Sequence, residues 1–132
     1  MKELFPHSAT TDGIVVRVSV SFLPEQSEPG KGRWFWAYHI RIENEGDLPV
    51  KLVSREWIIR DARGAQHEVR AEGVVGEQPL IQPSQSFDYV SGCPLSTPTG
   101  SMEGRYFMVR ADGRRFAVDI PHFPLIAPAV AT

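Results

Sequence analysis

Cysteine is almost absent from the sequence, which contains a single one, Cys93, among 132 residues. One cysteine cannot form a disulfide within the chain, and it cannot supply the several thiolates of a cysteine metal site. The sequence places no helix start and no cluster of basic residues beside Cys93. We therefore expect a buried or half-buried thiol rather than a nucleophile. Because nothing in the cysteine content requires an oxidising compartment, we also expect a cytoplasmic protein.

Long apolar runs are missing as well. No stretch approaches the 18 or so consecutive apolar residues of a membrane-spanning helix, and the first residues lack the apolar centre of a signal peptide. We therefore expect no membrane insertion.

Positive charge is not in excess. The chain has 14 Lys and Arg against 16 Asp and Glu, which gives a formal net charge of −2. A protein that neutralises several phosphates needs a basic surface, so nucleic acid is not expected as a partner.

Helical periodicity is lacking too, and the 11 Gly and 11 Pro argue against long helices. Instead, apolar and polar residues alternate as in half-buried strands. The clearest such strand is expected over 33–43, and we assign its aromatic side chains to the core rather than to an exposed stacking platform for bases. These aromatic residues are Trp34, Trp36 and Tyr38. Further strands are expected over 13–23, 50–60, 66–71, 80–82, 86–91, 105–110 and 114–120.

About seven strands with turns between them predict an all-β fold, namely an antiparallel β-sandwich of the immunoglobulin or fibronectin type III class. A barrel is the alternative. Asp112-Gly113 predicts a two-residue hairpin in which both residues have positive φ, and the Pro- and Gly-containing segment 92–104 predicts a long loop. We expect a single domain over 1–132, with a flexible lead at 1–12 and a flexible tail at 125–132.

The candidate binding site is a glycine-containing loop between two expected strands. It consists of Glu72, Gly73, Val74, Val75, Gly76, Glu77, Gln78 and Pro79. Closely spaced glycines let backbone N–H groups approach an anion. A dinucleotide-binding motif also needs a helix after the glycines, whereas Pro79 follows here, and the two glutamates would repel phosphate. A tight turn is the favoured interpretation, and a ligand site is the alternative.

Residue groups typical of catalysis or metal binding are not recognisable. His7, His39, His67 and His122 form no HxH or HxxxH pair. No serine lies in a nucleophile-elbow motif, and no Cys/His or paired-carboxylate spacing is found. We therefore expect no catalytic residue, no metal site and no cofactor, in a protein that is not an enzyme.

The glycine loop and several other segments resemble the ApaG family, also called CorD. The agreement extends over WFWAYHIRIEN (34–44), LVSREWIIRDARG (52–64), FDYVSG (87–92), TPTGSMEGRY (97–106) and FAVDIPHFP (116–124). The family's loop is usually written GxGxxG, and Ala71 stands here at the first glycine. The resemblance implies a fibronectin type III-like sandwich, an association with cobalt resistance and magnesium efflux, and genetic linkage to a diadenosine tetraphosphate hydrolase. Related eukaryotic domains occur in F-box proteins and in a DNA polymerase δ-interacting protein, which implies protein interaction.

We therefore expect a non-enzymatic binding module that presents the glycine loop and a sheet face to a protein partner of unknown identity. Weak homo-oligomers are compatible with this function. The alternative is a small-ligand protein that binds a nucleotide, pyrophosphate or a divalent cation at the glycine loop, in connection with diadenosine tetraphosphate metabolism. Weak hydrolysis of a nucleotide or of pyrophosphate is the enzymatic form of this alternative.

Overall fold

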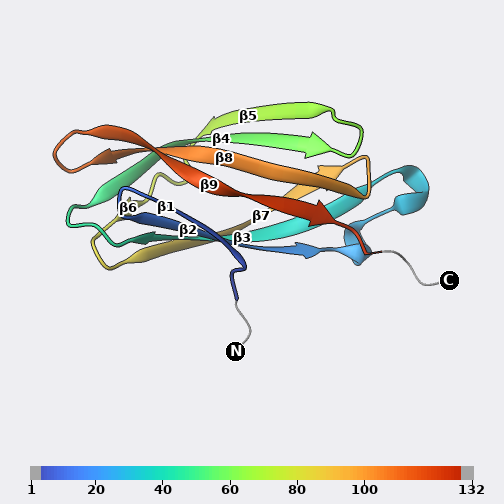
Figure 1. The fold of residues 1–132 in the computed structure, drawn as a ribbon, viewed down its shortest axis with the longest axis horizontal. Helices are drawn as coiled ribbons and strands as arrows, with labels where there is room; N and C mark the ends of the chain where they lie inside the picture. Colours follow the sequence, from blue (N-terminus) through green and yellow to red (C-terminus); the bar gives the residue numbers. More distant parts are fainter. Residues whose placement is uncertain (1–3, 129–132) are drawn as a thin grey trace.

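The computed structural model describes residues 4–128, which form two antiparallel sheets packed face to face (Figure 1). One sheet has the strand order β1-β2-β3-β7, and the other has the order β5-β4-β8-β9, with β6 paired to β4. The strands are β1 (His7–Thr11), β2 (Ile14–Phe22), β3 (Trp34–Asn44), β4 (Val50–Asp61), β5 (Gln66–Glu72), β6 (Leu80–Ile81), β7 (Ser86–Leu95), β8 (Thr99–Arg110) and β9 (Arg115–Ile126). The expected all-β sandwich is confirmed. Two short 3-10 helices lie between β2 and β3, at Pro24–Gln26 and Pro29–Lys31. Within residues 4–128, no helix is long and apolar enough to cross a membrane.

Alternation along β3 explains why this strand lies at the centre of the core. Trp36, Tyr38, Ile40 and Ile42 are buried on one face, while His39 and its neighbours on the other face are partly exposed. The two buried aromatic side chains pack against rings from other strands, with centroid distances of 5.5 Å from Trp36 to Phe22 and 5.4 Å from Tyr38 to Trp57. The expectation that this aromatic stripe belongs to the core is therefore confirmed for Trp36 and Tyr38, while Trp34 is half-buried.

Parts of the expected flexible lead and tail form strands. Strand β1 lies within the expected lead 1–12 and pairs with β2 from His7 opposite Val18 to Thr11 opposite Ile14. Strand β9 continues to Ile126. The prolines of its second half are tolerated because β9 is an edge strand, where a missing N–H costs no inner ladder bond. Residues 1–3 and 129–132 lie outside the described part of the chain.

Two turn predictions need correction. Strands β7 and β8 extend through most of the segment 92–104, which leaves a connection of only three residues, 96–98, in place of a long loop. In the β8–β9 connection, Gly113 has a positive φ of 89°, but Asp112 does not. The side chain of Asp112 instead accepts a hydrogen bond from the N–H of Arg114 at 2.9 Å, so a wider turn replaces the expected two-residue hairpin.

The two sides of the sandwich, where the edge strands of its sheets lie, differ from each other, and this difference positions the candidate site. At one side β9 approaches β1 and β2 of the other sheet closely. At the opposite side the sheets end in β5 and β7, and no comparable approach joins these two strands in residues 4–128. Strand β5 is accordingly exposed along nearly its whole length. The sandwich is therefore closed at the β1–β9 side and open at the β5–β7 side.

Candidate functional site

The glycine loop is a tight two-residue turn. The N–H of Val74 donates to the carbonyl oxygen of Glu77 at 2.8 Å, and the N–H of Glu77 donates back to the carbonyl oxygen of Val74 at 2.9 Å. Between them, Val75 has a φ of 42° and Gly76 a φ of 82°. Positive φ at both central residues is the pattern of a type I′ hairpin turn. A β-branched residue such as Val75 adopts this conformation rarely, so the turn holds local strain.

Gly73 is required by its surroundings, whereas Gly76 is required only by its backbone angle. A Cβ atom on Gly73 would overlap the carbonyl oxygen of Glu77 and lie 2.9 Å from its carbonyl carbon. The φ of Gly73 is also positive, at 60°. By contrast, a Cβ on Gly76 would meet no atom within 4 Å. The two glycines of the family motif thus have different physical roles.

The loop is fastened to β4 by side chains as well as by its backbone. Arg55 donates from Nη1 to the carbonyl oxygens of Gly73 (2.5 Å) and Glu72 (3.2 Å). Gln78 donates from Nε2 to the carbonyl oxygen of Val53 at 2.9 Å. Val74 is fully buried, so its side chain anchors the loop in the core. We infer that the loop is a rigid part of the surface.

Three backbone N–H groups of the glycine loop already donate hydrogen bonds within the protein. Those of Val74 and Glu77 close the turn, and that of Gly73 donates to the carbonyl oxygen of Val53 at 2.8 Å. The side chains of Glu72 and Glu77 are exposed beside them. An anion at this loop would compete with these internal bonds and face two carboxylates, which weighs against a phosphate cradle.

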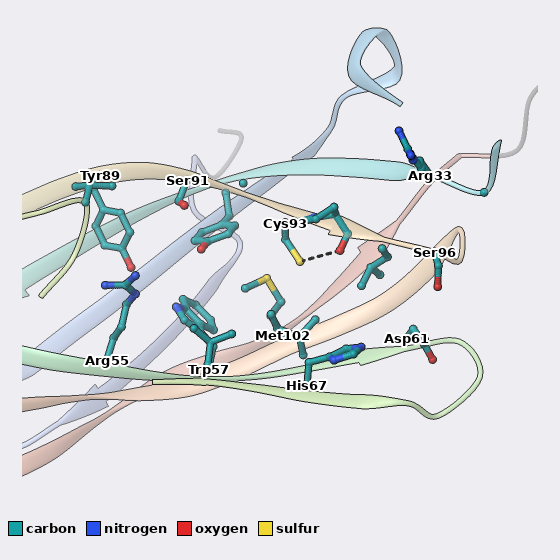
Figure 2. A pocket seen from close by; sticks show the side chains of 18 of the residues that line it. Arg33, Arg55, Trp57, Asp61, His67, Tyr89, Ser91, Cys93, Ser96 and Met102 are labelled. Carbon is teal, nitrogen blue, oxygen red and sulfur yellow. Dashed lines mark hydrogen bonds between the residues drawn. The ribbon is translucent and has the colours of Figure 1, made fainter. Parts of the chain in front are cut away.

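Beside the loop lies a cleft of about 800 Å³ between the two sheets, at the open β5–β7 side (Figure 2). Its walls are mainly inner-face residues of β3, β4, β5, β7 and β8, and residues 31–33 before β3 and Val75 of the glycine loop also line it. The lining is mainly apolar and aromatic. It includes Tyr38, Trp57, Ile59, Val69, Tyr89, Cys93, Leu95 and Met102. A cleft of this size and lining is typical of a binding site.

Charged side chains stand at both ends of this apolar cleft. Figure 2 shows Arg55 below the hydroxyl of Tyr89 at one end, and Arg33 and Asp61 at the other, with Trp57 between them. Arg55 lies on the inner face of β4, in the same row as Trp57 and opposite Ala71 of β5. Among residues 4–128, no ion pair includes Arg55 or Arg33. The cleft thus carries a cationic group that no carboxylate of the described chain neutralises.

This cleft was not predicted from the sequence. The residue that signals it is Arg55, a charged residue at an inward position of an otherwise apolar strand pattern. A second signal is β5, in which Val69 alone is strongly apolar, so the strand is poorly suited to cover a core face. Both features are visible in the sequence, but only the pairing of β4 with β5 shows that they face the same space.

The nucleophilic groups in the cleft are held in their protonated forms. Burial raises the pKa of the Cys93 thiol to about 11. Burial also raises the pKa of Tyr38 and Tyr89, an effect that the nearby Arg55 cation partly offsets. The hydroxyls of Tyr89 and Tyr106 are hydrogen-bonded to each other at 2.5 Å. The expectation of a buried thiol is confirmed for Cys93.

Stability is expected to fall as pH rises from about 9 towards 11. The folded-state pKa of Cys93 is raised above its unfolded value, so the folded protein retains a proton that the unfolded chain loses in this range. The stabilisation is complete below the unfolded pKa and is lost as pH approaches the folded pKa. Urea unfolding at pH 8, 9 and 10 measures this decline, and Cys93→Ala is expected to show a smaller one. An equal decline in both proteins would contradict the assignment.

The four histidines are distributed over the molecule. His67 lines the cleft, and His39 lies on the outer face of β3, with its Nε2 3.1 Å from a carboxylate oxygen of Asp88. His7 is near Phe123, and burial and the proximity of His122 lower its pKa. In residues 4–128, no group of three or more His, Cys, Asp or Glu side chains is arranged to hold a metal ion.

Comparison with known proteins identifies the family. The model of the ApaG domain matches residues 24–110. Protein ApaG of Bradyrhizobium diazoefficiens is 51% identical over 122 residues, which cover 92% of this chain and 94% of that protein. Protein ApaG of Bdellovibrio bacteriovorus is 52% identical over 113 residues, which cover 86% of this chain and 89% of that protein.

Solved structures agree with these sequence matches. A crystal structure of a Bordetella pertussis protein described as ApaA superposes with a TM-score of 0.86 and 41% identity over 97% of this chain and 100% of that one. The C-terminal domain of wzt is similar in fold alone, with a TM-score of 0.55 and 8% identity. With this match across the loop and most of both sheets, the chain belongs to the ApaG family.

Proposed function

We propose that this protein is a non-catalytic interaction module that binds a protein partner at the open side of its sandwich. The recognition surface consists of the cleft between β5 and β7 together with the rim formed by the glycine loop. The observation that carries the proposal is the cleft itself, a mainly apolar hollow between the sheets whose rim residues Val69 and Val75 are exposed to solvent. In a β-sandwich the inner face of each sheet is normally covered by the opposite sheet. A bound partner would bury the part of the cleft that the opposite sheet leaves exposed.

Two features of the cleft support partner binding over catalysis. Burial raises the pKa of its thiol and phenol groups, which disfavours the anionic forms that nucleophilic catalysis needs. Its strained turn is fastened by Arg55 and Gln78, which gives the rim one defined shape. A rigid rim lowers the entropic cost of binding a protein surface. We further propose that the module works in the cytoplasm and that any self-association is weak.

The small-ligand alternative at the glycine loop stays a prediction, as does the association with cobalt resistance and magnesium efflux. The internal hydrogen bonds of the loop weigh against anion binding there. A thermal-shift assay with ATP, diadenosine tetraphosphate, Mg²⁺ or Co²⁺ tests the small-ligand alternative. A ligand at 100 times its Kd should stabilise the protein by about 2.7 kcal/mol.

Substitutions in the cleft are expected to abolish partner capture. Val69→Asp and Val75→Asp each place a carboxylate in the apolar cleft or on its rim. Both positions tolerate the change in the free protein, because Val69 is 39% and Val75 56% exposed. The matched control is Val90→Asp. Val90 is 60% exposed, lies on the outer face of β7 and is not part of the cleft lining. Quantitative affinity capture from a native lysate is the measurement.

The expected result is that the two cleft variants lose proteins that the wild type and Val90→Asp retain, with at least a tenfold drop in recovery. Retention of the same proteins by all four baits would contradict the cleft as the recognition surface. Unfolding midpoints of the four proteins establish that each bait is folded.

A further inference from the structure

Strand β5 has a row of unused backbone hydrogen-bonding groups along its outer edge. At its two ends, the carbonyl oxygen of Ala65 accepts from the N–H of Asp61, and the N–H of Gly73 donates to Val53. In an antiparallel pair, hydrogen-bonded residues alternate with non-bonded ones. Since Ala65 and Gly73 are both bonded to β4, the odd-numbered residues of β5 are the ones that form hydrogen bonds with β4. The N–H and C=O groups of Gln66, Glu68 and Arg70 point away from β4, and β5 is the last strand of its sheet.

This edge is less protected than the other edge of the same sheet. Strand β9 contains two prolines, which remove N–H groups, and it approaches β1 and β2 of the opposite sheet. Strand β5 contains no proline and is exposed on both faces. An exposed edge without proline is a template for an added strand.

A strand added at this edge would face the cleft with every second side chain, because side chains alternate between the two faces of a sheet. Each cleft-facing residue of β5 lies directly opposite a cleft-facing residue of β4. Ala71 is opposite Arg55, Val69 is opposite Trp57, and His67 is opposite Ile59. An inward side chain of the added strand beside Val69 would enter the apolar part of the cleft. The next inward position, two residues along, would lie beside Ala71 and Arg55.

Arg55 defines the chemistry of that position. Its two hydrogen bonds to the loop carbonyls come from Nη1, and its Nε and Nη2 groups donate no hydrogen bond to a residue in 4–128. A guanidinium group has five N–H donors, and a carboxylate is the acceptor that best matches the remaining ones. No carboxylate of the described chain pairs with Arg55, so a carboxylate of a bound molecule would be its first ionic partner.

We propose that the partner of this module presents an extended peptide segment that pairs with the outer edge of β5. The segment places an apolar side chain in the cleft beside Val69 and, two residues away, a carboxylate on Arg55. This inference rests on the proposed function, since it names the part of the partner that the cleft receives.

The test uses linear peptides as probes. A phage library of random 12-residue peptides is selected on the wild-type protein and, in parallel, on Val69→Asp. The expected result is enrichment, on the wild type alone, of sequences with an acidic and an apolar residue separated by one position. The enriched peptides are then synthesised, and their Kd values are measured by fluorescence anisotropy.

Two protein variants separate backbone pairing from side-chain contact. Glu68→Pro removes an outward N–H that β4 does not use, and Glu68→Ala removes the same side chain but keeps the N–H. We expect at least tenfold weaker peptide binding to Glu68→Pro and a change of less than twofold for Glu68→Ala. Replacement of the peptide's acidic residue by its amide is expected to weaken binding at least fivefold. If Glu68→Pro does not fold, hydrogen exchange of the Glu68 and Arg70 amides in the wild type replaces it, and slower exchange with bound peptide is expected.

The outcomes distinguish this inference from the proposed function. Equal peptide binding by Glu68→Pro and Glu68→Ala, unchanged amide exchange, or no enriched peptide would overturn strand addition. If Val69→Asp still loses its captured proteins in that case, the proposed function stands without it. A wild-type dimer that Glu68→Pro converts to a monomer would show that a second copy of this chain occupies β5, and it would likewise overturn the peptide assignment.

Discussion

Replacement of Gly73 by alanine is expected to destabilise the protein by about 2–5 kcal/mol, because two separate costs apply. A side chain at a φ of 60° costs about 1–2 kcal/mol for an L-residue. The added Cβ also overlaps the carbonyl oxygen of Glu77, and that carbonyl accepts the hydrogen bond that closes the turn. Relief of the overlap would move the turn away from Arg55, which donates to the carbonyl oxygen of Gly73 itself. The change is measured as the free energy of unfolding in urea.

Gly76→Ala is the matched control for this substitution. Its φ of 82° imposes the same kind of backbone strain, but no atom lies within 4 Å of the added Cβ. We expect a loss of about 1–2 kcal/mol for Gly76→Ala, clearly smaller than that for Gly73→Ala. Equal losses in the two variants would show that the close approach to Glu77 is unimportant. Partner capture by Gly73→Ala is expected to fall as well, because Val75 of the displaced turn belongs to the cleft rim.

Phe123→Ala is expected to cost about 3–5 kcal/mol, the range for removal of a fully buried aromatic side chain. Phe123 has no exposed surface, although it lies between two prolines in the sequence. Its ring packs 6.1 Å from that of Tyr38 and 6.0 Å from that of Trp57, so its removal leaves a cavity between the sheets. Urea unfolding measures the loss.

His122→Ala is the control at the neighbouring position. Its side chain is exposed, and we expect a change within about 0.5 kcal/mol. A loss below about 1 kcal/mol for Phe123→Ala would mean that the second half of β9 contributes little to the core.

Alternation of apolar and polar residues was sufficient to predict most of the strands. The pattern of β3 places its aromatic residues on one face, and the observed burial of Trp36 and Tyr38 agrees with it. The pattern failed where local composition and tertiary context disagreed. Residues 7–11 lack an apolar stripe, and yet they form β1, because the free edge of β2 pairs with them. Residues 121–126 contain two prolines and still form a strand, because they lie at an edge and bury Phe123 and Leu125 against the other sheet.

The glycine loop was predicted as a tight turn, and its two-residue geometry agrees with that interpretation. What the sequence did not show is the separate role of each glycine. The neighbour that excludes a side chain at Gly73 is the carbonyl of Glu77, which only the folded turn brings there. The same applies to Arg55, whose partners Glu72 and Gly73 are 17 and 18 residues away in the chain.

The residue patterns alone predict the all-β class, the core position of the β3 aromatic residues and the turn character of the glycine loop. Each of these depends on periodicity or on the backbone freedom of glycine. The lack of a helix start and of a basic cluster beside Cys93 in the sequence predicts its buried thiol. The cleft, by contrast, depends on where the two sheets stop covering each other. That is decided by the close approach of β9 to β1 and β2 on one side and by the exposed β5 on the other. The burial of one sheet's inner face by the other depends on how the two sheets pack, and no single strand determines it. The surface on which the proposed function rests is for this reason visible only in the tertiary structure.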